Sequence, residues 1–151
     1  MCNVLVSACL LGVNCRYNGI PKKNEDIARL IDTEGIHLVP VCPEQLGGMA
    51  TPRCPAERRG QLIINAAGED VTAHYLRGAR ETLRIAQLYH CSVALLKERS
   101  PSCGSRQIYD GSFSGTLTEG AGVTAALLRE NGIAVFGESE AEQAVERIGA
   151  K

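Results

Sequence analysis

Cys9, Cys42 and Cys103 are the residues of this chain best suited to chemistry, because each follows an apolar run, Cys9 and Cys42 directly and Cys103 in the loop after it. Short apolar runs are typical of buried strands. Open α/β sheets bind their ligands beyond the carboxyl ends of the strands, where loops converge. The three thiols, although far apart in the sequence, are therefore expected to meet at one edge of a sheet.

Thiolate ligands distributed in this way suit an iron–sulfur cluster better than magnesium or calcium. The chain has no Cys-x-x-Cys pair, and three histidines fall on predicted strands or helices outside the thiol-bearing loops: His37, His74 and His90. A zinc finger is therefore not supported. Three protein ligands on a four-iron cluster leave one iron open, as a catalytic site requires. Spacing alone leaves incidental, buried cysteines as an equal alternative.

The other four of the seven cysteines are assigned by their position. Cys15 and Cys54 share loops with Cys9 and Cys42, so each is a candidate spare ligand or resolving thiol. Cys2 and Cys91 flank predicted strands and are expected to be small buried apolar side chains. An odd number of cysteines in a reducing compartment favours metal binding or catalysis over a disulfide framework.

Proton-transfer groups stand beside two of the proposed ligands. Glu44 lies two residues beyond Cys42 and is either a general acid or base or a loop carboxylate paired with Arg53. Ser100 and Ser102 place hydroxyl groups beside Cys103. Four arginines in or near these loops would hold an anionic substrate or a negatively charged cluster: Arg16, Arg53, Arg99 and Arg106.

The step Gly120-Ala121-Gly122 leads into a predicted helix and could hold an anion at the helix N-terminus. It lacks the strand and the glycine spacing of a dinucleotide fingerprint. A Rossmann-type cofactor is therefore disfavoured.

Four apolar runs predict the strands that position these residues: Asn3 to Ser7, His37 to Val41, Ser92 to Lys97 and Ile133 to Phe136. Helical segments separate the strands. The clearest spans 72 to 90, where one stripe is expected to face the core: Leu76, Ala79, Leu83, Ala86 and His90.

Capping signals delimit three further helices. Asn24 is expected to cap a helix running to about Asp32, and Gly132 to follow one ending near Glu130. Ser139 and Glu142 predict a capping box for a last helix.

Strands alternating with helices specify a mostly parallel sheet covered on both faces. We therefore predict an α/β three-layer sandwich with a short, mostly parallel sheet, Rossmann-like or flavodoxin-like. Two connections, 42 to 72 and 100 to 118, are long enough to be functional. A short edge strand at 62 to 64 and a hairpin turning at Asp110-Gly111 are expected within them.

The length, net charge and aromatic content of the chain indicate which kinds of molecule it binds. With 151 residues and 44% hydrophobic side chains, the chain is expected to form one domain, residues 1–151. A net charge of −1 and few aromatic residues argue against a nucleic-acid binder and favour small-molecule substrates. No apolar run of transmembrane length and no signal sequence is evident, so we expect a cytoplasmic protein with no membrane contact. Its oligomeric state is not indicated.

Several blocks of sequence, in order, resemble a bacterial family catalogued as a domain of unknown function, which includes thiouracil desulfidase. The resemblance covers about residues 3 to 137. The blocks are Ser7-Ala8-Cys9-Leu10-Leu11-Gly12 with Arg16-Tyr17-Asn18-Gly19, Pro40-Val41-Cys42-Pro43-Glu44 with Gly47-Gly48 and Thr51-Pro52-Arg53, Ser100-Pro101-Ser102-Cys103-Gly104, and Ile108-Tyr109-Asp110-Gly111.

The resemblance implies a [4Fe-4S] cluster held by Cys9, Cys42 and Cys103, with the sulfur of a thiolated nucleobase bound to the open iron. It implies conversion of thiouracil to uracil and sulfide, with Glu44 as the acid or base and Ser100 as the active-site serine. Ser102 is the weaker match for the serine. A thiocarbonyl sulfur is soft and prefers iron to a hard cation, so these roles agree with the chemistry.

Three positions depart from the family pattern: Asn18, Cys54 and the Gly120-Ala121-Gly122 step, which lacks an acidic middle residue. A changed substrate preference would fit these departures. Two other functions compete with the desulfidase. One is a non-catalytic metal or sulfur carrier using the same cysteines, which would need neither Glu44 nor Ser100. The other is a thiol redox protein that cycles Cys9 and Cys15.

Overall fold

A parallel sheet forms the centre of the computed structural model, which describes residues 2–149. Its strands run in the order β2-β1-β5-β8, and every neighbouring pair is parallel. They are β1 (Cys2–Ser7), β2 (Ile36–Val41), β5 (Val93–Leu96) and β8 (Ala134–Gly137). Each predicted strand is therefore confirmed to within one residue at either end. Counted along the sheet alone, the order is 2-1-3-4, as in flavodoxin-like folds, which bind ligands beside the first strand.

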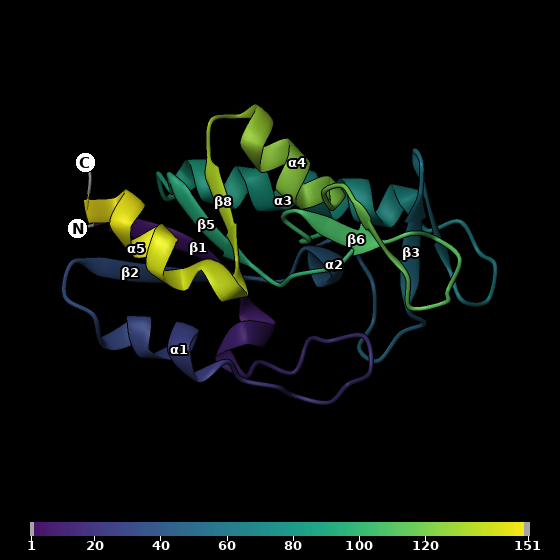
Figure 1. The fold of residues 1–151 in the computed structure, drawn as a ribbon, viewed down its shortest axis with the longest axis horizontal. Helices are drawn as coiled ribbons and strands as arrows, with labels where there is room; N and C mark the ends of the chain where they lie inside the picture. The colour runs from purple at the N-terminus through teal and green to yellow at the C-terminus, as the bar shows by residue number, and fades with distance from the viewer. Residues whose placement is uncertain (1, 150–151) are drawn as a thin grey trace.

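Helices cover both faces of this sheet (Figure 1). On one face, Leu5 and Leu96 pack against α3 (Thr72–Leu88) and α4 (Val123–Glu130). On the other, Val4 and Val6 pack against α1 (Glu25–Ala28) and α5 (Ala141–Gly149). Alternate residues of a strand point to opposite faces, so each strand contributes to both cores. The predicted three-layer sandwich is confirmed.

Two of the three predicted helix-capping signals are confirmed at the ends of the helices, and one is wrong. Asn24 caps α1 by accepting a hydrogen bond from the Ile27 N–H at 3.1 Å, and a 3-10 turn (Arg29–Asp32) continues to the predicted end. Gly132, at φ 81°, ends α4. The capping box at Ser139 and Glu142 is wrong. Ser139 instead donates its backbone N–H to Glu98, and a 3-10 turn (Glu138–Glu140) precedes α5.

The buried face of α3 matches the predicted stripe at Ala79, Leu83 and Ala86 but not at Leu76 and His90. Leu76 is 41% exposed and His90 lies beyond the helix, whereas the inward residues are Tyr75, Gly78, Ala79, Thr82 and Ala86. Small side chains face inward because α3 packs very closely against α2 (Pro43–Leu46). A hydrophobic pattern favours the largest apolar side chain at each turn and misses such a contact.

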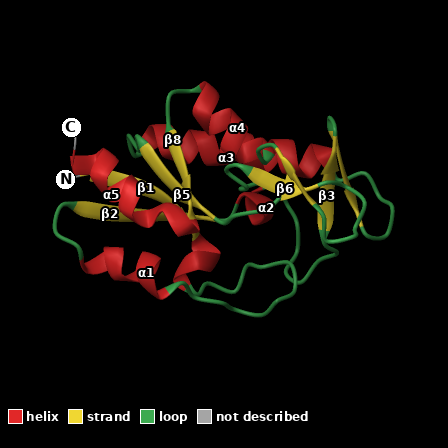
Figure 2. Cartoon of the chain, in the orientation of Figure 1, coloured by secondary structure: helices red, strands yellow, loops and turns green. Residues whose placement is uncertain are grey.

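The two long connections fold into antiparallel hairpins beyond the carboxyl ends of the strands (Figure 2). β3 (Ala56–Arg59) pairs with β4 (Leu62–Asn65), so the predicted strand at 62 to 64 exists, in a sheet of its own. β6 (Gln107–Tyr109) pairs with β7 (Leu117–Glu119). The hairpin is confirmed, but its loop is longer than an Asp-Gly turn because the Asp110 carboxylate instead accepts the Ser112 N–H at 2.9 Å.

A buried carboxylate joins the two hairpins. Glu57 of β3 accepts the backbone N–H of Gly111 at 3.0 Å and of Phe113 at 3.1 Å. Arg59 returns a hydrogen bond from Nε to the Gly111 carbonyl at 2.6 Å. The two insertions, although separated in sequence, therefore form one structural unit at the end of the sheet.

Replacement of Gly78 by alanine is expected to destabilise the protein by about 1–3 kcal/mol, because its Cβ would lie 1.9 Å from the Pro43 carbonyl oxygen. Helix propensity alone predicts the opposite sign, since alanine is favoured over glycine by about 1 kcal/mol. Denaturant unfolding measures the change. Gly149→Ala, where no atom lies within 4 Å of the new Cβ, is the control and should not destabilise. An equally neutral Gly78→Ala would contradict the close packing of α2 on α3.

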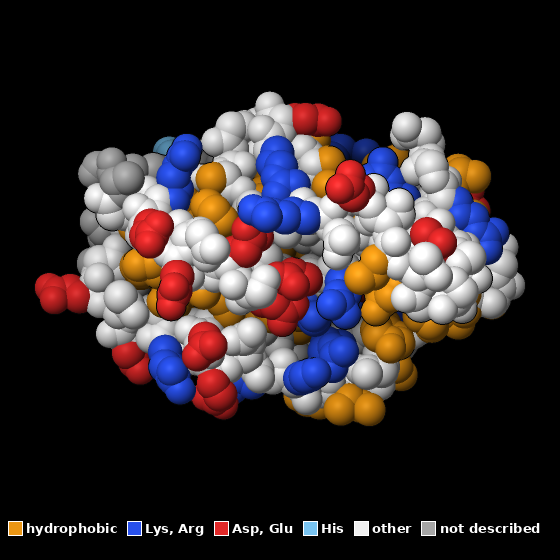
Figure 3. Space-filling model, viewed as in Figure 1, with side chains coloured by type: hydrophobic (Ala, Val, Ile, Leu, Met, Phe, Trp, Pro, Cys, Tyr) orange, Lys and Arg blue, Asp and Glu red, His pale blue; other side chains and the backbone are white. Residues whose placement is uncertain are grey.

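No helix within residues 2–149 is long and apolar enough to cross a membrane. Acidic and basic side chains are interspersed over the face drawn in Figure 3, in keeping with the net charge of −1.

Candidate metal and acid–base site

The three predicted ligands follow three neighbouring strands of the sheet. Cys9 lies in a 3-10 turn (Ala8–Leu11) directly after β1, and Cys42 is the N-cap of α2 directly after β2. Cys103 lies in the turn that follows β5 and is buried. The charges of Cys9 and Cys42 act on the Cys103 thiol. The structure therefore brings these cysteines to the edge of the sheet where the sequence predicted them.

Cys15 lies between two of these thiols and is 2% exposed. Its side chain hydrogen-bonds with those of both Cys9 and Cys42, which lowers the pKa of both thiols, that of Cys42 to about 7. The same two contacts raise the pKa of Cys15 itself, so Cys15 keeps its proton while its neighbours become thiolates. The single S–H of Cys15 can therefore bond to one candidate ligand at a time, either Cys9 or Cys42.

Burial strongly raises the pKa of the Cys103 thiol, and a hydrogen bond with Ser7 opposes this effect. The turn that carries Cys103 is built around Ser100. The Ser100 Oγ accepts the backbone N–H of Ser102 at 3.0 Å and of Cys103 at 3.1 Å. Positive charge close by would be needed to hold Cys103 as a thiolate, as a bound metal provides.

The Gly120-Ala121-Gly122 step packs against this turn. A Cβ on Gly122 would lie 2.3 Å from the Ser102 carbonyl oxygen, so only glycine allows α4 to approach so closely. Ser102 itself points into the core, where its hydroxyl hydrogen-bonds with that of Thr124 at 2.7 Å. Close packing is therefore sufficient reason for Gly122, without an anion at the helix N-terminus.

Glu44 is held from two sides beside the thiols. Arg53 donates from Nε to Glu44 Oε2 at 2.7 Å and also contacts that oxygen through Nη2. Ser100 donates its hydroxyl to Glu44 Oε1 at 3.3 Å. The side chains of Glu44 and Arg53 are only 15% and 6% exposed. Ser100, not Ser102, is therefore the serine that contacts Glu44, and Glu44 is both paired with Arg53 and close to the cysteines.

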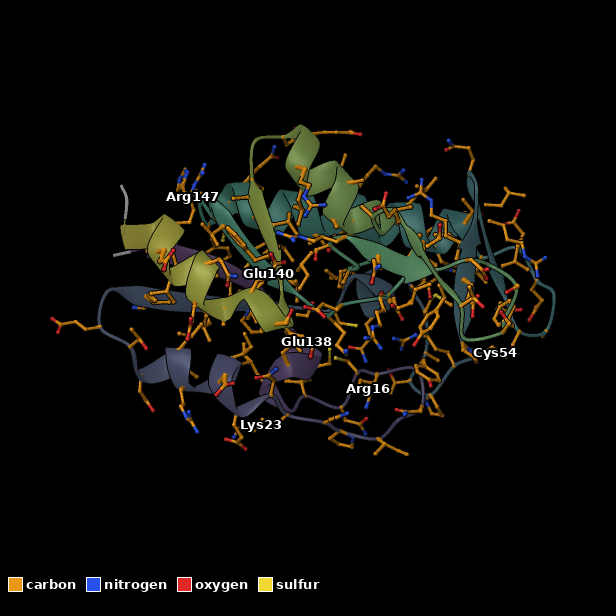
Figure 4. The ribbon with its side chains drawn as sticks, in the orientation of Figure 1. Arg16, Lys23, Cys54, Glu138, Glu140 and Arg147 are labelled. Carbon is orange, nitrogen blue, oxygen red and sulfur yellow. The ribbon has the colours of Figure 1, made fainter. Side chains whose placement is uncertain are left out.

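Arg53 also joins two loops of the site. Its Nη2 donates to the Cys15 carbonyl at 2.9 Å and its Nη1 to the Ala50 carbonyl at 3.0 Å. Of the other three arginines, Arg106 pairs with Glu140 at 2.6 Å. Figure 4 shows Arg16 on the loop below the ends of the strands. Arg53 is thus the arginine that the structure places against Glu44.

The remaining cysteines lie apart from this group. Cys54 is exposed in the loop before β3, and no hydrogen bond joins its side chain to the other thiols in the described residues. Cys91 is buried in the core as expected, where burial raises its pKa to about 11. Cys2 is half-buried at the start of β1.

Within the described residues, no three His, Cys, Asp or Glu side chains converge closely enough to ligate a single ion. Thiolates that bind different irons of a cluster lie further apart than the ligands of one ion. The three thiols are therefore not arranged as the ligands of one ion.

The family model for 2-thiouracil desulfurase matches residues 4–140. The chain belongs to this family. The 2-thiouracil desulfurase family match confirms the resemblance seen in the sequence. The chain is 48% identical over 147 residues to the uncharacterized protein YbbK of Bacillus subtilis (strain 168), covering 91% of this chain and 96% of that protein. It is also similar to a solved structure described as the [4Fe-4S]-dependent thiouracil desulfidase TudS, with 42% identity, a TM-score of 0.92 and coverage of 100% of both chains.

Two features of the candidate site in this member of the 2-thiouracil desulfurase family were not predicted from the sequence. One is Cys15 as a shared donor, which depends on how the loop after β1 folds back. The other is Tyr75, which is 3% exposed and whose pKa is raised by burial and by the charge of Glu44. The spacing of Tyr75, Ala79, Thr82 and Ala86 along one helix face was the available signal for its burial.

In the metal-free protein, iodoacetamide is expected to modify Cys42 at least about tenfold faster than Cys91 at pH 7, because thiolate is the reactive form. Cys42 has a pKa of about 7, whereas that of Cys91 is about 11. Peptide mass spectrometry over a time course gives both rates from one sample. Equal rates would show that Cys15 does not lower the pKa of Cys42.

Proposed function

We propose that this protein removes sulfur from a small thiolated nucleobase such as thiouracil, giving uracil and sulfide. The observation that carries the proposal is the meeting of thiols from three strands with a carboxylate, Glu44, that is held beside them by Arg53 and Ser100. Membership of the 2-thiouracil desulfurase family supports it, as does the likeness to the [4Fe-4S]-dependent thiouracil desulfidase.

Cys9, Cys42 and Cys103 would hold a [4Fe-4S] cluster. The donor set fits, since the hydrogen bonds from Cys15 lower the pKa of Cys9 and Cys42 and so favour the thiolate form that binds metal. When bound, the cluster supplies a soft Lewis acid, at an iron without a protein ligand, that polarises the carbon–sulfur bond.

The protein's own residues transfer the protons and position the attacking water. Glu44 accepts one proton from water as the water oxygen bonds to the thiocarbonyl carbon, and it gives that proton to the leaving sulfur as the carbon–sulfur bond breaks. The second water proton leaves the oxygen as the new carbonyl forms and also ends on the sulfur. One water is consumed and one hydrogen sulfide is released, so the reaction needs no electron donor or acceptor. Arg53 fixes Glu44 Oε2, which leaves Oε1, the atom beside Ser100, for the proton transfer.

Anaerobic reconstitution with iron and sulfide, followed by iron counting and a sulfide-release assay on thiouracil, tests the proposal. We expect about four irons per chain and equal amounts of uracil and sulfide. Cys42→Ser should take up less iron, whereas Cys54→Ser, at the exposed cysteine, should match the wild type.

A protein that takes up no iron would overturn the proposal. A loaded protein that releases no sulfide from thiolated bases would favour the carrier hypothesis. Loss of activity in Cys15→Ser with the cluster intact would favour the thiol redox hypothesis, in which Cys9 and Cys15 cycle.

A further inference from the structure

Tyr75 brings a hydroxyl group to the site that the functions assigned above leave unused. It lies in the first turn of α3, and its ring packs with Ala56, Ile63 and Val71 under the β3–β4 hairpin. Only 3% of the residue is exposed. Burial and then the charge of Glu44 raise its pKa, and the charges of Arg53, Cys103 and Cys42 also act on it, so its hydroxyl lies within electrostatic range of the site.

The position of Tyr75 is fixed by close helix packing. Gly78 and Gly47 each lack a Cβ where α3 meets α2, and the His74 ring nitrogen Nδ1 lies 2.8 Å from the Gly47 carbonyl oxygen. The α2 helix carries Glu44 in its first turn. The phenol and the carboxylate are therefore mounted on two helices that are locked against each other.

The Tyr75 hydroxyl has no hydrogen-bond partner among residues 2–149. Within the same residues, Thr82 Oγ1 is the one enclosed side-chain polar atom that lacks a partner. The Tyr75 oxygen is therefore not fully enclosed by the protein, so a water molecule can reach it. A buried hydroxyl without a partner is costly unless a ligand or water supplies one.

We propose that the Tyr75 hydroxyl donates a hydrogen bond to the oxygen atom that replaces the substrate sulfur, first as the attacking water and then as the new carbonyl oxygen. This rests on the proposed desulfidase function. Tyr75 and Glu44 act on the same water from two sides, Glu44 by accepting its proton and Tyr75 by donating to its oxygen. Burial and the charge of Glu44 raise the pKa of Tyr75, so the hydroxyl keeps the proton it donates.

This assignment predicts a difference between substrate and product. The thiolated base carries sulfur where the product carries oxygen, so the hydrogen bond from Tyr75 contributes little to substrate binding and fully to uracil binding. It also stabilises the negative charge that is left on the oxygen whenever an O–H proton is removed from it, before and after the oxygen bonds to the carbon. Substitution of a residue with a merely structural role would not weaken uracil binding while leaving substrate binding unchanged.

The test compares the reconstituted wild type with Tyr75→Phe, which removes only the hydroxyl. We expect kcat on 2-thiouracil to fall by roughly 100-fold, the Kd for uracil by calorimetry to rise roughly tenfold, and KM and iron content to stay close to wild type. Tyr89→Phe, at the exposed far end of α3, is the control and should leave all four unchanged.

Unchanged kcat and unchanged uracil affinity in Tyr75→Phe would overturn the assignment while leaving the desulfidase proposal intact. A loss of iron, or an increase in KM equal to that in the uracil Kd, would also overturn it. A wild type that releases no sulfide would instead overturn the desulfidase proposal. The calorimetric comparison on uracil would still decide whether Tyr75 contacts that oxygen.

Discussion

Replacing Glu44 with glutamine is expected to lower sulfide release by roughly 100- to 10,000-fold while the iron content stays at the wild-type level. The amide keeps the size of the side chain and can still contact Arg53 and Ser100, the two partners of the carboxylate. It cannot accept the proton that water must lose. Sulfide release and iron counting on the same reconstituted sample measure both effects.

Glu142→Gln is the matched control, because Glu142 is an exposed carboxylate in the first turn of α5. It should leave activity unchanged. If Glu44→Gln released sulfide at the wild-type rate with its iron in place, Glu44 would have no role in proton transfer. That result would support the hypothesis of a non-catalytic metal or sulfur carrier.

Arg53→Met is expected to destabilise the metal-free protein by about 3–5 kcal/mol, because it leaves the carboxylate of Glu44 buried without its partner. The variant also removes the hydrogen bonds that Arg53 donates to the Cys15 and Ala50 carbonyls. Denaturant unfolding under reducing conditions measures the loss.

The double variant Glu44→Gln/Arg53→Met should recover part of that stability, because an uncharged amide is less costly to bury than an unpaired carboxylate. The control is Arg29→Met, whose ion pair with Asp26 has side chains 75% and 79% exposed. That variant should change stability by less than about 1 kcal/mol. Equal losses in Arg53→Met and Arg29→Met would mean that the Glu44–Arg53 pair is not buried in solution.

The strands were predictable because a buried parallel strand needs only a short apolar run, and the ends of these runs placed Cys9, Cys42 and Cys103 correctly. The cap at Asn24 was predictable because it depends on residues within one turn. The flavodoxin-like strand order agrees with the predicted class. The extent of the single domain, residues 1–151, and the cytoplasmic location stay predictions.

What could not be predicted depends on contacts between distant segments. Ser139 offered a plausible helix cap, but Glu98 competes successfully for its N–H. The helical period identified Ala79 and Ala86 on the inward face of α3, but not the close approach of Gly78 to Pro43, which depends on a separate helix. The roles of Cys15 and Ser100 depend in the same way on loops that fold back on each other.

The carboxylate of Glu57 has a consequence for how this end of the molecule opens. Its bonds to the Gly111 and Phe113 amides span the two insertions, and a lone carboxylate freed at a buried position would be costly. Unfolding of one insertion alone therefore has a high free-energy cost while the other stays folded. Fluctuations that admit or release a small molecule beside the sheet should involve both hairpins as one cooperative unit, separate from the opening of the central sheet.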